Sequence, residues 1–280
     1  MKIGVSSYSF SKYMKETGCN YFKICDIAKE IGFDGIEFIE LEHDAKSVEA
    51  AGSQVAFAEQ LREHCAKLGL EISAYTIGAD FIDRENEVER LKGQVDVAVA
   101  LGVNVMRHDV TWRRDVAWRE IIERTAPMIR EVTEYAASKG VVTCSENHGM
   151  VMQDAHRVEE LILTVNHPNY RWLVDMGNFL CADEPPMHAL PIAAPYAVHA
   201  HAKDFIFKSE APSDGWIITR GGNAIRGTIV GHGVVPLKEC IGELRKAGYD
   251  KWLSLEFEGM EDNLTALKLG YQHLKKVVGE

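Results

Sequence analysis

The sequence predicts an α/β fold of the (β/α)8 barrel type, formed by one domain over residues 1–280. A helix that ends near a glycine and is followed by an apolar strand occurs five times along the chain. Glycine stops a helix because it adopts left-handed backbone angles without strain. The apolar run behind it is typical of a buried parallel strand. The five junctions contain Gly32, Gly69, Gly102, Gly140 and Gly248.

Eight segments have the length and character of barrel strands, and helix-like sequence separates most of them. In the helix expected over 55–68, apolar residues recur every three or four positions, which is the period of an amphipathic helix. The alternative, a doubly wound open sheet, lacks support because YSFSKYMKETG after the first strand contains no glycine-rich phosphate-binding pattern. The strands are expected near 2–8, 35–39, 70–76, 103–109, 141–147, 171–176, 196–203 and 252–257.

Composition limits the classes of partner. The chain has 31 basic and 42 acidic residues, and its net charge of −11 argues against nucleic acid, whose binding depends on Lys and Arg. No apolar stretch approaches the roughly 18 residues of a membrane span, and MKIGVSSYSF does not have the pattern of a signal peptide. The six cysteines form no CxxC pair and do not suggest a disulfide scaffold. We therefore expect a cytoplasmic protein without nucleic-acid or membrane partners, and a homo-oligomer stays open.

Four of the expected strands end in a side chain that can bind a divalent metal: Glu146, Asp175, His201 and Glu256. The C-terminal strand ends of a (β/α)8 barrel converge on one mouth, where active sites are built. Carboxylates suit Mn²⁺ and Mg²⁺, and an imidazole also admits Zn²⁺ or Co²⁺. We expect one bound divalent ion, with Mn²⁺ as the first choice and Zn²⁺ as the second.

Each of these residues has an ordinary explanation when taken alone. Glu256 would be a solvated strand end, Asp175 before Met-Gly-Asn would form an Asx turn, and His201 would be a core histidine. Their joint occurrence at corresponding ends of four successive strands favours the metal site.

Strand alternation predicts which side chains accompany the cluster. In HAHAKD, His199, His201 and Lys203 share one face, with His199 one layer deeper. His148 shares a face with Glu146. At the end of the fourth strand, His108 and Arg107 either line the mouth or leave Arg107 paired with Asp109, and Glu37 in DGIEF is a further acidic candidate. The residues expected to bind substrate are His108, Asn178, Lys203 and Arg226.

The segment 205–235 lacks clear periodicity, and long irregular segments in compact domains are usually lids or binding loops. It contains Trp216, Arg220 and Arg226. We predict that it covers the substrate or contacts a neighbouring subunit.

The chain resembles the sugar isomerase/epimerase group of xylose-isomerase-like TIM barrels, which includes inosose isomerases and dehydratases, ketose 3-epimerases and hydroxypyruvate isomerases. The resemblance extends from GVSSYSF and IGFDGIEF to GHGVVPLKECIGELRKAGYDKWLSLEFEG, its most specific block. It implies that Glu146 in SENH, Asp175 in VDMGN, His201 in HAHAKD and Glu256 in LSLEFE bind the metal. Ketose 3-epimerases have a histidine where this chain has Asn178, and they lack a counterpart of His148.

This site predicts removal of a carbon-bound proton next to a carbonyl that the metal polarises. With Glu146 and Glu256 as the acid/base pair, the protein is an isomerase or epimerase of a small carbohydrate: a sugar, a sugar phosphate or a keto-inositol. With His148 as the base, it is instead a lyase or dehydratase of a keto-sugar, inosose or keto-glycoside.

Two other classes fit less well. A DNA-repair nuclease on this barrel needs further histidine ligands on the early strands, and LEISAYT and DGIEFI carry none. A metal-free binding protein is disfavoured because all four ligand positions hold competent residues.

Overall fold

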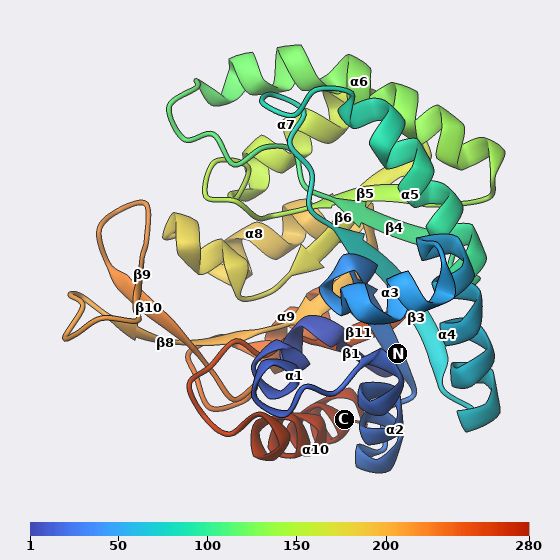
Figure 1. Cartoon of the computed structure of the whole chain (residues 1–280). Coiled ribbons are helices and arrows are strands. Elements are labelled where there is room, and N and C mark those ends of the chain that lie inside the picture. The colour runs from blue at the N-terminus through green and yellow to red at the C-terminus, as the bar shows by residue number, and fades with distance from the viewer. Residues whose placement is uncertain (280) are drawn as a thin grey trace.

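A closed barrel of eight parallel strands forms the centre of the computed structural model, which describes residues 1–279 (Figure 1). Neighbouring strands of the barrel follow one another in the sequence, and the last pairs with the first. The predicted fold class is therefore confirmed. The barrel strands are β1 (Lys2–Ser6), β2 (Gly35–Ile39), β3 (Glu71–Ile77), β4 (Val105–His108), β5 (Val142–Glu146), β6 (Tyr170–Asp175), β7 (Ala197–Ala202) and β11 (Trp252–Leu255).

Helices surround the barrel and connect its strands (Figure 1). The five predicted glycines follow helices with φ between 63° and 112°, the left-handed region that glycine adopts without strain. No helix within residues 1–279 combines the length and apolar character needed to cross a membrane. The helices are α1 (Ser11–Thr17), α2 (Tyr21–Ile31), α3 (Ala45–Ala51), α4 (Gln54–Leu68), α5 (Glu87–Leu101), α6 (Trp118–Ser138), α7 (Ala155–Val165), α8 (Pro186–Ala193), α9 (Leu237–Lys246) and α10 (Asn263–Gly279), with 3-10 turns η1 (Ser7–Phe10), η2 (Leu41–Asp44), η3 (Asn178–Ala182) and η4 (Ala194–Tyr196).

The main apolar core lies between the strands and the helices. Phe38 of β2 illustrates it: its ring stacks on Tyr21 of α2 with centroids 5.4 Å apart, and Tyr21 in turn stacks on Phe57 of α4. A second, smaller cluster of strand residues is separate from this core and includes Cys144, which shares a face of β5 with Glu146. This small cluster forms an apolar floor beneath the charged side chains at the strand ends. Its buried members are Ala74, Val105, Cys144, Leu173 and Val198.

The segment after β7 is more regular than its sequence suggests. It forms an antiparallel sheet of β8 (Asp204–Lys208), β10 (Ala224–Thr228) and β9 (Ile217–Ile218), which projects from the barrel in Figure 1. The expectation of an irregular loop was therefore wrong. The short strands pair across about fifteen intervening residues, and such non-local pairing leaves no periodic signal in a local window.

Candidate metal centre

Four side chains from four barrel strands meet at the C-terminal end of the barrel. Each of them offers a ligand atom, and the four atoms all lie within 4.8 Å of one another. Glu146 and Asp175 end β5 and β6, His201 lies in β7, and Glu256 follows β11 directly. All four side chains are buried. The structure thus brings together the residues expected to bind the metal, and their role as ligands stays a prediction.

His201 directs its Nδ1 atom at the three carboxylates. This atom lies 3.8 Å from Glu146 Oε1, 3.7 Å from Asp175 Oδ2 and 3.6 Å from Glu256 Oε2. Within the described chain, neither His201 Nδ1 nor Asp175 Oδ2 has a hydrogen-bond partner, although both atoms are fully buried. Buried polar atoms are nearly always paired. The two unpartnered atoms and the oxygen-rich donor set therefore fit a divalent cation.

The two carboxylate oxygens of Asp175 have different roles. Oδ1 accepts hydrogen bonds from the backbone N–H groups of Gly177 at 2.7 Å and Asn178 at 2.8 Å, which is the Asx turn that the sequence left open. This turn holds the carboxylate in place and leaves Oδ2 directed at the cluster. The two explanations of Asp175 are therefore compatible.

Arg107 of β4 is the buried cation next to Glu146. Its Nη2 atom lies 2.8 Å from Glu146 Oε2 and 2.6 Å from Asp109 Oδ1. Burial alone would lower the pKa of Arg107, but the two carboxylates outweigh burial and raise it. Burial also raises the pKa of Glu146, although the charge of Arg107 opposes the shift. The sequence left open whether Arg107 lines the mouth or pairs with Asp109, and the structure shows both.

Lys203 forms ion pairs with Glu256 and Glu258. Its Nζ atom lies 2.6 Å from Glu256 Oε2 and 3.4 Å from Glu258 Oε2. Burial would lower the pKa of Lys203, but these carboxylates raise it, so the amine stays charged. Burial would raise the pKa of Glu256, but the charges of Lys203 and His201 lower it well below its usual range.

A cavity of about 270 Å³ opens above the cluster. His148 lines it and pairs with Asp109, with His148 Nδ1 2.9 Å from Asp109 Oδ1. Burial would lower the pKa of His148, and the Asp109 carboxylate more than offsets burial and raises it. The ring also meets Trp112 edge-on at 5.0 Å. The lining residues are Tyr8, Ile39, Glu40, His43, Thr76, Ile77, Gly78, Arg107, Asp109, Trp112, Glu146, His148, Lys203, Glu256 and Glu258.

Two of the residues expected to bind substrate lie away from this cavity. His108 faces out of the barrel, where its ring stacks on Tyr170 and meets Phe81 edge-on, and burial lowers its pKa to about 4. Arg226 lies on β10, with its guanidinium 4.8 Å from the ring centroid of Trp216. Neither residue lines the cavity, so their placement does not favour contact with a substrate there, and both roles stay predictions. His108 and Arg107 are neighbours on one strand, so alternation allows only one of them to face inward.

Of the other two expected substrate-binding residues, one lines the cavity and one contacts residues of the cluster. Lys203 lines the cavity. Asn178 lies behind it, donating from Nδ2 to Glu146 Oε1 at 2.8 Å and accepting from Lys203 Nζ at 3.2 Å. Asn178 therefore contacts one cluster carboxylate and the lysine that holds another.

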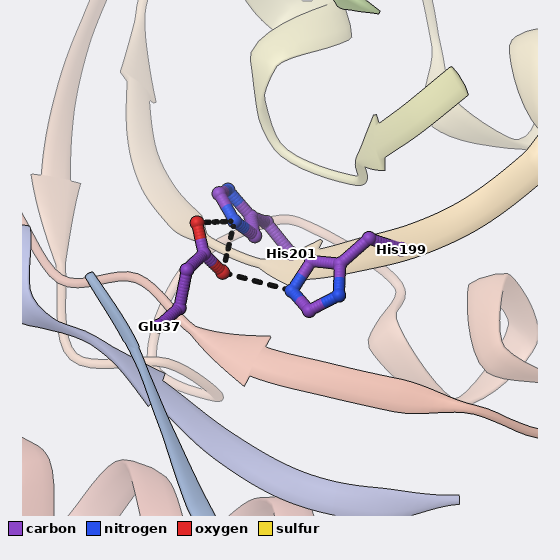
Figure 2. A group of neighbouring side chains, drawn as sticks. All are labelled: Glu37, His199 and His201. Carbon is purple, nitrogen blue, oxygen red and sulfur yellow. Dashed lines mark hydrogen bonds and ion pairs between the residues drawn. The ribbon is translucent and has the colours of Figure 1, made fainter. Parts of the chain in front are cut away.

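Glu37 lies closer to the cluster than its place in DGIEF suggested. Figure 2 shows its carboxylate between the rings of His199 and His201, inside the barrel. The signal that could have identified it is alternation in GIEFI: Ile36 and Phe38 are apolar and face the helices, so Glu37 between them faces the barrel interior.

Known proteins share the barrel fold of this chain. Residues 25–277 match the family model described as xylose isomerase-like TIM barrel. The uncharacterized protein YihM of Escherichia coli K12 is 24% identical over 255 residues, which cover 90% of this chain and 70% of YihM.

Solved structures share the fold. The probable 3-DHS dehydratase AsbF of Bacillus anthracis superposes with a TM-score of 0.76 at 20% identity, covering 98% of this chain and 99% of AsbF. The 3-keto-D-glucoside 4-epimerase YcjR of E. coli superposes with a TM-score of 0.73 at 16% identity, covering 99% of both chains. Two further structures, with TM-scores of 0.75 and 0.74, contain a zinc atom and magnesium. With the family model matching most of its length, this chain belongs to the xylose isomerase-like TIM barrel family.

Proposed function

We propose that the protein is a divalent-metal-dependent isomerase or epimerase of a small keto-sugar or related carbohydrate. The observation that carries this proposal is the convergence of three carboxylates and one imidazole, with two buried atoms left unpartnered, beneath a cavity. A bound divalent ion would polarise the substrate carbonyl and stabilise negative charge on its oxygen. Mn²⁺ is our first choice, and Zn²⁺, Mg²⁺ and Co²⁺ also suit the donor set; the zinc and magnesium in related structures support this range.

In an isomerase or epimerase, Glu146 and Glu256 would form the acid/base pair. Glu146 lines the cavity at the cluster, where its carboxylate could accept a carbon-bound proton of a bound substrate. Glu256 would return a proton, and because its pKa is lowered, it would first take that proton from the charged amine of Lys203, 2.6 Å away. Small carbohydrates are the substrates of the related epimerase YcjR and fit a cavity of about 270 Å³.

A lyase is the second candidate, and the pairing of His148 with Asp109 favours it. This pair faces the cavity, and the carboxylate orients the ring as in other acid/base pairs. His148 would remove the proton next to the carbonyl, and a leaving group at the next carbon would depart with the electron pair. The likeness to the dehydratase AsbF is consistent with this candidate.

Solvent exchange tests the step that both candidates share. The metal-loaded protein is incubated in D₂O with a panel of keto-sugars, inososes and 3-keto-glycosides, and mass spectrometry follows deuterium and products. We expect deuterium at a carbon next to the carbonyl of at least one substrate. An isomeric or epimeric product supports the first candidate, and a dehydrated or cleaved product supports the second. Absence of exchange across the panel would refute the proton abstraction that both share.

The substitution His148→Asn separates the two candidates. Asn keeps a polar side chain of similar size, and His148 is not among the four clustered ligands, so we expect the metal content to be unchanged. An epimerase or isomerase should then retain measurable turnover because its glutamates are intact. Loss of a general base lowers kcat by about 10²–10⁴-fold. A drop beyond a thousandfold, with metal still bound, would overturn our preference and favour the lyase. His156→Asn, at an exposed position on α7, is the matched control and should leave kcat unchanged.

A further inference from the structure

Glu37 is a carboxylate inside the barrel that lies behind the cluster and does not reach the cavity. We infer that Glu37 is the positioning residue that determines which nitrogen of His201 faces the metal centre. This inference rests on the metal centre proposed above and adds a determinant of its affinity.

The geometry links Glu37 to the far side of the His201 ring. Both oxygens of Glu37 lie 2.9 Å from His201 Nε2, while His201 Nδ1 faces the three carboxylates of the cluster (Figure 2). Glu37 and His201 are both fully buried, so water does not compete for these contacts. The imidazole is thus held between an acceptor at one nitrogen and the cluster at the other.

The chemistry of the two groups sets the tautomer. An ionised carboxylate only accepts hydrogen bonds, and a neutral imidazole has one N–H group. A metal-bound imidazole is neutral, and with Glu37 behind it the hydrogen is on Nε2, so the lone pair of Nδ1 is directed at the cluster. Removing this constraint lets the hydrogen occupy Nδ1, where it would block coordination. Partners of this kind behind a metal-binding histidine typically contribute about 10- to 100-fold in metal affinity.

Glu37 accepts from two further donors, and these decide how a variant behaves. His199 Nε2 lies 2.8 Å from Glu37 Oε2, and Thr76 Oγ1 lies 2.6 Å from Glu37 Oε1. Glutamine has a similar shape but one acceptor oxygen and an NH₂ group. Both Glu37 oxygens contact His201 Nε2, so in Glu37→Gln the NH₂ group faces that nitrogen whichever way the amide is turned, and His201 loses its strict preference for hydrogen on Nε2.

Calorimetric titration of the metal-free protein with Zn²⁺ and Mn²⁺ tests the inference without any activity assay. We expect the Kd of Glu37→Gln to exceed that of the unmodified protein by about 10- to 100-fold. Ser254→Ala is the matched control: Ser254 Oγ lies 2.9 Å from His199 Nε2 in the same buried network, and it makes no hydrogen bond to His201. Its Kd should equal that of the unmodified protein. Equal affinities in the unmodified protein and in folded Glu37→Gln would overturn the inference.

A spectroscopic measurement keeps the inference testable if Glu37→Gln does not fold. Proton–nitrogen correlation spectra of the zinc-loaded protein with ¹⁵N-labelled histidine report which ring nitrogen of His201 carries hydrogen, and His201→Asn assigns the signal. Hydrogen on Nε2 with zinc at Nδ1 supports the role of Glu37, whereas hydrogen on Nδ1 refutes it. If the unmodified protein binds neither metal, the proposed metal centre itself fails, and this result is distinct from equal binding by the two proteins.

Discussion

Removal of divalent metal by a chelator is expected to lower turnover by about a thousandfold or more, and added Mn²⁺ should restore it. Stabilisation of a developing oxyanion by a metal ion contributes several kcal/mol, and each 1.36 kcal/mol is about tenfold in rate. The described residues offer no equivalent in the cavity, because the cations Arg107 and Lys203 are already paired with carboxylates. Turnover is measured on the substrate identified by solvent exchange, and metal content by mass spectrometry.

The same treatment should change stability. The clustered carboxylates repel one another in the absence of a cation, and a metal at a thousand times its Kd stabilises the folded state by about 4 kcal/mol. Unfolding midpoints with and without Mn²⁺ measure this difference. A chelator already saturated with zinc is the control, and it should have no effect. Full turnover by protein shown to be free of metal would contradict the proposed chemistry.

The substitution Arg107→Met is expected to reduce the free energy of unfolding by about 3–5 kcal/mol, the usual result of removing one partner from a buried ion pair. Methionine fills much of the same space, but Asp109 and Glu146 then lose the cation that both contact. Asp109 would keep His148 and Glu146 would keep the Asn178 amide, but both buried carboxylates would lose their guanidinium partner. Urea unfolding of the metal-free protein measures the loss, since a bound cation would mask part of it.

Arg113→Met provides the matched control for this prediction. Arg113 also contacts two aspartates, Asp115 at 2.6 Å and Asp83 at 2.9 Å, but its side chain is 38% exposed. Exposed ion pairs contribute about 0–1 kcal/mol, so this variant should be nearly as stable as the unmodified protein. Similar losses of unfolding free energy in Arg107→Met and Arg113→Met would show that burial does not make the Arg107 ion pairs more stabilising than exposed ones.

The local sequence was sufficient to predict the barrel and the cluster at its mouth. Glycines after helices, followed by apolar runs, mark the helix-to-strand junctions, and each of the five predicted glycines has the expected backbone angles. The four clustered residues could be named because each lies at or next to the end of a strand, and parallel strands in a closed barrel end on one side. These properties depend on a residue's own neighbours in the chain.

Only the tertiary structure decided the partners of each side chain. Glu37 meets His201 although 164 positions separate them, and Arg107 of β4 meets Glu146 of the neighbouring strand β5. Strand alternation predicts which face of a strand a side chain occupies. Whether two side chains touch also depends on the strand register and on their positions along the barrel axis. Local sequence patterns also did not predict the β8–β10–β9 sheet, because β8 and β10 pair across a long turn. Sequence periodicity thus determined the scaffold and the strand ends, while strand register selected the contacts, because it places residues that are distant in sequence at hydrogen-bonding distance.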